Sequence, residues 1–205
     1  NLRFRLRRAA LYPLSYGGQG SFKVYAVCMS LKLAGQWVWD SWFVRDGDTH
    51  HAYYLQASRA LGDPDRRHRN VSVGHAISTD LINWTVVADA LAISDSPAFD
   101  SYTTWTGSVI KNVDGKWWMF YTGTSREDGG DIQSIGAATS DDLFTWQKVS
   151  SDALVRADEN FYAKLDKAAW HDEAFRDPWV FKFQPTDDLW HMLVTARGKG
   201  GPDKD

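Results

Sequence analysis

Two aspartates lie inside aromatic stretches of the sequence. Asp40 sits in WVWDSW, and Asp177 sits in FRDPW. Because an unpaired buried charge is costly, a carboxylate in such a stretch is hydrogen-bonded, ion-paired or functional. Two carboxylates that converge in an aromatic-lined pocket can cleave a glycosidic bond: one attacks or activates water, and the other, when protonated, assists the leaving oxygen. We therefore take both as candidate catalytic residues; for Asp40 the alternative is a strand-end residue that caps a backbone amide.

An internal repeat indicates which elements position these aspartates. Residues 73–87 (VGHAISTDLINWTVV) align without a gap on residues 135–149 (IGAATSDDLFTWQKV), with seven identities in fifteen at a constant offset of 62. Each copy is typical of a strand, a Ser/Thr-Asp turn and a second strand. Upstream, residues 51–57 correspond to residues 117–123, and each segment follows an acidic turn that signals a hairpin.

Further strands precede these turns at residues 37–44 and 104–110, and a third unit begins at residues 175–183. Four antiparallel strands per repeat are typical of propeller blades, whereas a sandwich does not predict a gapless repeat. The repeat is too long for tryptophan-aspartate repeats. We predict an all-β fold: a partial β-propeller of about two and a half four-stranded antiparallel blades.

The predicted organisation divides the chain into a lead-in of uncertain structure and the amino-terminal part of a propeller domain. The lead-in covers residues 1–36, the propeller residues 37–205, and the blades residues 37–90, 102–152 and 174–205. Residues 159–174 are expected to contain a turn or two of helix.

The first strand of each propeller blade lines the central channel, which is where Asp40 and Asp177 are expected. They are 137 residues apart, which is about two repeat units. The same strand position in the first and third blades therefore carries a carboxylate, and we expect both side chains to point into one channel.

Three motifs, WVWDSW, WTGS and FRDP, occur in this order at blade spacing. Together they resemble the motifs of the five-bladed propeller glycoside hydrolases, which include families 32 and 68 (invertases, levanases, inulinases and levansucrases) and the related families 43 and 62. The Arg-Asp-Pro string is typical of the fructan-acting side, and WDSW resembles the levansucrase strand more than the invertase one. The resemblance covers residues 37 to about 196.

The resemblance implies roles for individual residues. Asp40 would be the nucleophile that forms a covalent fructosyl intermediate, and Asp177 the transition-state stabiliser, with Arg176 as a clamp on hydroxyls and carboxylate. The implied sugar pocket is shaped by Trp39, Trp42, Trp105 and Ser108. For the tryptophans, the alternative role is packing between blades.

The sequence departs from the resembled families in its general acid. That residue would be a Glu on the first strand of a fourth blade, but the last glutamate here is Glu173, and residues 178–205 contain none. We therefore expect a fragment of a longer enzyme that is inactive alone. Two alternatives stay open: an inverting arabinan- or xylan-type glycosidase in which Asp40 activates water, and a non-catalytic propeller that binds carbohydrate.

The composition limits the classes of binding partner that are expected for the chain. A net charge of -3 and a pI near 6.1 argue against nucleic acid or an anionic membrane, and no 18-residue apolar run exists, so a carbohydrate is the expected partner. The histidine spacing fits no ligand pattern, so neither metal nor cofactor is predicted.

Residues 63–69 (DPDRRHR) are expected to form a solvated loop, with a pocket rim carrying Arg66, Arg67 or Arg69 as the alternative. No segment makes a convincing signal peptide, and both localisation (cytoplasmic or secreted) and oligomeric state stay open.

Overall fold

The computed structural model describes residues 31–186 and 188–200; most of the predicted lead-in lies outside these ranges. The strands form two four-stranded antiparallel sheets and one hairpin. The first sheet contains β1 (Gln36–Asp46), β2 (Thr49–Ser58), β3 (Ser72–Ser78) and β4 (Thr85–Val86). The second contains β5 (Thr103–Lys111), β6 (Trp117–Thr124), β7 (Gln133–Ser140) and β8 (Gln147–Lys148), and the hairpin joins β9 (Phe175–Phe181) to β10 (His191–Ala196). No helix in the described part of the chain is both long and apolar enough to cross a membrane.

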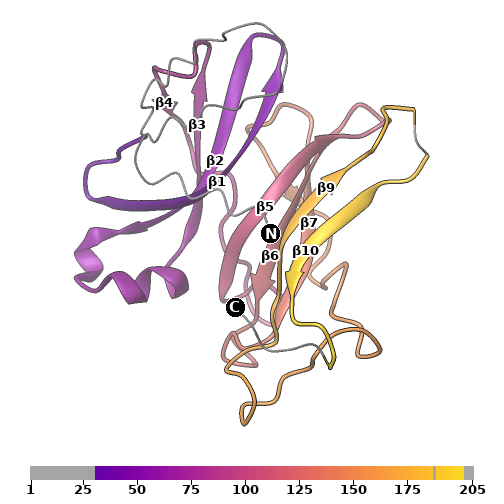
Figure 1. Ribbon diagram of the computed structural model, residues 1–205. Coiled ribbons are helices and arrows are strands. Elements are labelled where there is room, and N and C mark those ends of the chain that lie inside the picture. The colour runs from indigo at the N-terminus through magenta and orange to yellow at the C-terminus, as the bar shows by residue number, and fades with distance from the viewer. Residues whose placement is uncertain (1–30, 187, 201–205) are drawn as a thin grey trace, which may run out of the picture.

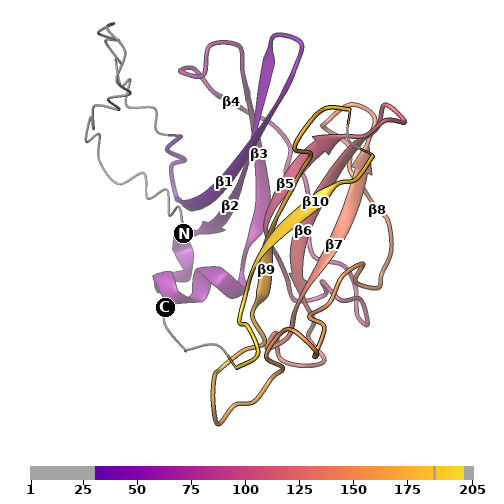
Figure 2. The ribbon, with the colours of Figure 1, turned by 45° about the vertical axis from the view of Figure 1, so that its right-hand side comes forward.

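Successive sheets pack in a repeating manner. Strand β5 packs across β1, β2 and β3 of the first sheet, and β9 packs across β5, β6 and β7 of the second. Figures 1 and 2 show the sheets fanned out, and in Figure 1 β5 lies between β1 and β9. This is the arrangement of neighbouring propeller blades. The prediction of an all-β, partial propeller with four-stranded antiparallel blades is confirmed.

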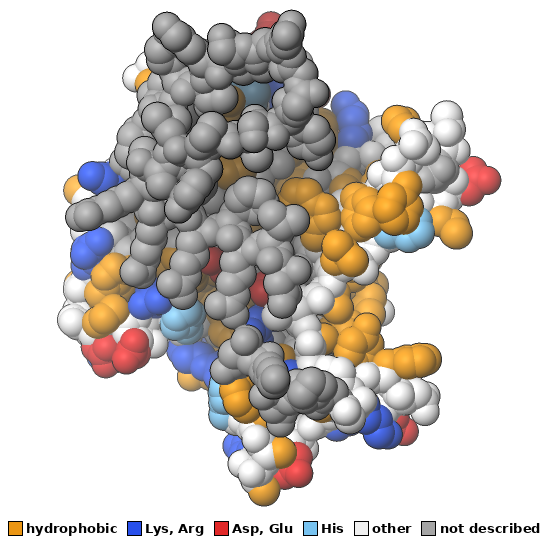
Figure 3. All heavy atoms as spheres, in the orientation of Figure 1, with side chains coloured by type: hydrophobic (Ala, Val, Ile, Leu, Met, Phe, Trp, Pro, Cys, Tyr) orange, Lys and Arg blue, Asp and Glu red, His pale blue; other side chains and the backbone are white. Residues whose placement is uncertain are grey.

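The interface between the two sheets forms the main hydrophobic core. Its fully buried side chains include Tyr53 and Val73 from the first sheet and Met119 and Tyr121 from the second. The hairpin differs, because side chains of β9 and β10 are exposed on the face seen in Figure 3, where hydrophobic side chains gather over these strands. Burial is therefore greatest where one sheet covers the next.

The sequence repeat is reproduced in its hydrogen bonds. The hydroxyl of Ser78 accepts from the amide of Leu81 at 2.9 Å, and that of Ser140 accepts from the amide of Leu143 at 2.8 Å. In each turn the intervening aspartate accepts from two later amides. Both leucines adopt a positive φ, 61° and 66°. The Ser-x-Asp-Leu segment thus forms the same turn twice, because its hydrogen bonds are local.

The predicted correspondence of residues 51–57 with 117–123 is wrong by one residue. Tyr54 pairs with Gly74, and Tyr121 pairs with the repeat-equivalent Gly136, so Tyr54 corresponds to Tyr121. A slip of one residue exchanges the faces of a strand, so the observed register places Tyr54 and Tyr121 on equivalent faces of their strands. A Cβ at Gly74 would lie 2.4 Å from the Tyr54 ring, which shows why glycine stands there.

No continuous helix forms within residues 159–174, and turns occupy that segment. Two of them are single helical turns, in which the carbonyls of Asp158 and Asp166 each accept from the amides three and four residues later. In the polar loop, 3₁₀ segments form at η1 (Arg59–Leu61) and η2 (Pro64–Arg69). Asp63 caps the second by accepting from the amide of Asp65, and Pro64 occupies its first position.

Candidate active site

Each first strand is interrupted by a β-bulge at a candidate residue. The bulge lies at Trp39 and Asp40 in β1, at Thr106 in β5, and at Asp177 and Pro178 in β9. A bulge bends its strand and redirects a side chain, and bulges are common next to active sites. The three interruptions therefore explain how neighbouring strands aim polar side chains at one place.

That place is a cavity of about 380 Å³, a size within the range of small-molecule sites. Asp40 and Asp177 both line it, from the first sheet and from the hairpin. Trp39, Trp105 and Arg176 also line it. The two aspartates, 137 residues apart in sequence, thus share a single aromatic-walled cavity with the guanidinium groups of Arg69 and Arg176.

Asp40 is exposed to the cavity and is held by one neighbour. The hydroxyl of Thr106 donates to its Oδ2 at 2.7 Å. Thr106 is the β5 counterpart of Asp40, since Ser41 pairs with Tyr54 and Gly107 pairs with Tyr121. Sequence analysis included Thr106 only as part of the WTGS motif and gave it no role, although its place in the repeat was the signal that could have indicated one.

Asp177 is half-buried and has a positive φ of 59°. Its amide donates to the hydroxyl of Thr122 at 2.9 Å. Burial raises the pKa of the Asp177 carboxyl, and the negative charge of Asp40 raises it further. The Arg176 guanidinium and a hydrogen bond from Thr195 act in the opposite direction and lower this pKa. The negative charge of Asp40 therefore contributes to the raised pKa of Asp177.

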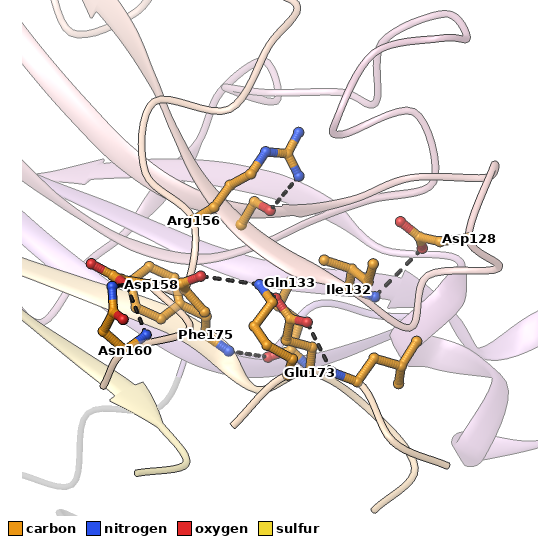
Figure 4. Close-up of polar contacts among 12 residues, drawn as sticks. Asp128, Ile132, Gln133, Arg156, Asp158, Asn160, Glu173 and Phe175 are labelled. Carbon is orange, nitrogen blue, oxygen red and sulfur yellow. Dashed lines mark hydrogen bonds and ion pairs between the residues drawn. The ribbon is translucent and has the colours of Figure 1, made fainter. Parts of the chain in front are cut away.

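Arg176 is oriented by a buried glutamine of the second sheet. Its Nε lies 3.5 Å from Oδ2 of Asp177, and its Nη1 donates to Oε1 of Gln133 at 3.2 Å. Gln133 also accepts from the amide of Phe175 at 3.1 Å and donates to Asp172 at 2.8 Å (Figure 4). Gln133 belongs to no motif, so the sequence carried no signal for its role.

The family model of the glycosyl hydrolases family 32 N-terminal domain matches residues 41–203, most of the sequence. The chain belongs to glycosyl hydrolase family 32. The match begins directly after Asp40 and includes Thr106, Arg176 and Asp177.

Curated relatives are similar over about three fifths of the chain. A fructan 1-exohydrolase of Aegilops speltoides is 36% identical over 131 residues, which are 62% of this chain and 20% of the relative. An insoluble beta-fructofuranosidase isoenzyme of Arabidopsis thaliana is 36% identical over 134 residues, with shares of 63% and 20%. The chain thus spans about a fifth of the length of the curated relatives it matches.

The fold likeness extends to solved structures. The fructofuranosidase of Schwanniomyces occidentalis, solved with fructose, superposes with a TM-score of 0.61 at 18% identity, covering 81% of this chain and 31% of that one. At this identity the likeness concerns the fold. It supports the arrangement of blades around β1, β5 and β9.

Two residues predicted to shape the sugar pocket of this family 32 chain lie elsewhere. Trp42 is 3% exposed and stacks on Tyr53 in the core. Ser108 is 4% exposed, and its hydroxyl accepts from the amide of Val180 at 3.1 Å, joining β5 to β9. Neither lines the cavity. Strand alternation after each bulge turns these side chains toward the packed interface, so the prediction for both is corrected.

The polar loop, expected to be solvated, forms part of the cavity wall. His68 and Arg69 line the cavity. The indole nitrogen of Trp105 donates to the carbonyl of His68 at 2.9 Å, and Arg69 donates to the carbonyl of Gly130 at 3.0 Å. The Arg69 guanidinium also lies 5.6 Å from the Trp105 ring centroid, within cation-π range. These contacts fasten η2 to the second sheet.

Within the described ranges, no group of three or more histidine, cysteine, aspartate or glutamate side chains is arranged to hold a metal ion.

Proposed function

We propose that the chain supplies Asp40 and Asp177 to the active site of a retaining glycoside hydrolase that cleaves or transfers β-fructofuranosyl units. The observation that carries the proposal is the convergence of both carboxylates, with Arg176, on one cavity. The names of the relatives, fructan 1-exohydrolase and beta-fructofuranosidase, support fructans and sucrose as substrates.

In the proposed first step, Oδ1 of Asp40 bonds to the anomeric carbon of the fructosyl unit as the glycosidic carbon–oxygen bond breaks. The hydroxyl of Thr106 holds Oδ2. This leaves the other oxygen for attack and fixes its direction. In the second step, water or a sugar hydroxyl attacks the same carbon and gives its proton to the group that protonated the leaving oxygen in the first step, and Asp40 leaves as a carboxylate.

Asp177 and Arg176 are proposed to stabilise the transition state. The carboxylate of Asp177 accepts from fructosyl hydroxyls as positive charge develops on the ring, and Arg176 holds that carboxylate in place. Trp39 and Trp105 supply apolar walls for the sugar face.

The leaving oxygen also needs a proton. No glutamate of the described residues lines the cavity. In this proposal the general acid is a Glu from outside residues 1–205, as the family resemblance implies. We therefore expect residues 1–205 alone not to cleave fructosides.

The test compares aspartate variants in the protein expressed from its complete gene. Asp40→Asn is expected to lower kcat on sucrose or inulin by about 10⁴-fold or more, because the nucleophile is lost. Asp177→Asn is expected to lower it by about 10²- to 10³-fold. Asp46→Asn is the matched control, since Asp46 lies on the same strand, is exposed and pairs with Lys111 at 3.7 Å. The proposal fails if Asp40→Asn behaves like Asp46→Asn.

Product stereochemistry tests the retaining step. Fructosyl transfer to methanol should yield methyl β-fructofuranoside, which NMR distinguishes from the α-anomer. The α-anomer would contradict a covalent intermediate and favour an inverting role for Asp40 as a base.

A further inference from the structure

The backbone around the two aspartates is joined by one buried hydroxyl. Thr122, in β6, is 0% exposed. Its hydroxyl donates to the carbonyl of Thr106 at 3.2 Å and accepts from the amide of Asp177 at 2.9 Å. Both partners lie in bulges, where the strand ladders are interrupted. The hydroxyl therefore satisfies groups that the interrupted ladders leave without regular strand partners.

The bond to Asp177 holds an unfavourable conformation. Asp177 has a φ of 59°, in the left-handed region that costs a non-glycine residue free energy unless its surroundings hold it there. The other bond holds the carbonyl of Thr106, whose side chain donates to Asp40. A single side chain thus fixes the backbone behind both carboxylates.

We propose that Thr122 is a positioning residue that sets the relative placement of Asp40 and Asp177. The inference rests on the proposed function of these aspartates, and Thr122 itself acts through Thr106 and the Asp177 amide. Placement errors near 1 Å lower enzymatic rates by about 100-fold, so loss of this hydroxyl is expected to lower turnover rather than substrate binding.

The variants separate positioning from folding. Thr122→Val keeps the branched shape and removes the hydroxyl, whereas Thr122→Ser keeps the hydroxyl. Thr124→Val is the matched control: Thr124 lies on the same strand, is also 0% exposed, and its hydroxyl contacts that of Thr103 at 2.7 Å. Residues two apart share a strand face, so both valine variants lose buried hydrogen bonds on that face, two in Thr122→Val and one in Thr124→Val.

In the complete protein, assayed well below the thermal midpoint of every variant, Thr122→Val is expected to lower kcat on sucrose or inulin by about 10- to 100-fold, with KM changed less than about threefold. Thr122→Ser and Thr124→Val should stay within about threefold of the unaltered kcat. Equal losses in Thr122→Val and Thr124→Val, or no loss in Thr122→Val, would overturn the proposal.

A crystal structure of the Thr122→Val variant decides the inference independently of activity. The expected result is an Asp177 that has left the positive-φ region and a lengthened contact between Thr106 and Asp40. An unchanged Asp177 backbone and an unchanged Thr106 contact would overturn the positioning role. If the unaltered protein releases no fructose from any β-fructoside, the proposed function fails, while this structure still decides the role of Thr122. If Thr122→Val does not fold, the kcat values of Thr122→Ala and Thr122→Ser are compared. A kcat about 10- to 100-fold lower in Thr122→Ala supports the positioning role, and equal values overturn it.

Discussion

The same turn occurs in the first and second sheets, yet its central leucine has opposite surroundings. Leu81 and Leu143 share a positive φ and the same serine cap, but Leu81 is 37% exposed and Leu143 is fully buried. The second turn is covered because the hydroxyl of Tyr53, from the first sheet, donates to the carbonyl of Leu143 at 2.7 Å. Local sequence therefore sets the turn, whereas the neighbouring sheet sets its burial.

The largest expected effect follows directly from this difference. Leu143→Ala removes a fully buried side chain and should lower the free energy of unfolding by about 2–5 kcal/mol. Leu81→Ala should change it by less than about 1 kcal/mol. Urea denaturation of both variants measures the difference. Equal losses would mean that the leucines stabilise their turns and not the contact between sheets.

A buried histidine pair also distinguishes the first sheet from the second. His51 Nδ1 and His75 Nε2 lie 2.9 Å apart, whereas the repeat-equivalent of His75 is Ala137. Burial, together with the charge of a protonated His51, lowers the pKa of His75 to about 4; burial also lowers the pKa of His51, against the charge of Asp46.

The sign of the resulting pH dependence is fixed by these lowered pKa values. The unfolded chain binds protons near the ordinary pKa of 6.5, before the folded chain does, so the free energy of unfolding falls as the pH drops from about 6.5 to 4. The loss attributable to His75 should be up to about 3 kcal/mol. His75→Gln should flatten this dependence in urea titrations across that pH range. An unchanged slope would show that the pair does not control acid stability.

The smallest effect contrasts the two aspartates. Because the pKa of Asp177 is raised, its ionised form is disfavoured on folding, so stability decreases as the pH rises through that pKa. At neutral pH, Asp177→Asn should therefore raise the free energy of unfolding by about 0.5–1 kcal/mol, helped by the tolerance of asparagine for positive φ. Asp40 is exposed, so Asp40→Asn should leave stability within about 0.5 kcal/mol. Thermal melts at pH 7 check both, and a destabilised Asp177→Asn would contradict the contrast.

Sequence reasoning recovered the parts of the site that carry a local signal. Asp40 and Asp177 stood out as carboxylates among aromatics, and the repeat placed them two units apart. Thr106 was within reach of the same repeat. Gln133 was not, because its role depends on partners about 40 residues away, Asp172 and Phe175.

The errors at Trp42 and Ser108 have a common physical cause. A bulge adds one residue and reverses the alternation that follows, and no residue type in WVWDSW or WTGS reports that change. The wall formed by η2 was predicted only as the alternative to a solvated loop, for a different reason. A charged loop is typically solvated, and only the contacts of Trp105 and Arg69 with the neighbouring loops reveal its place.

The central claim is that Asp40 bonds to the sugar. The direct measurement is peptide mass spectrometry of the complete protein, quenched with acid while it turns over sucrose. The account predicts one fructosyl unit, ester-linked to Asp40, on the peptide that contains it. A fructosyl unit attached to any other residue, or undiminished turnover in the Asp40→Asn variant, would contradict it.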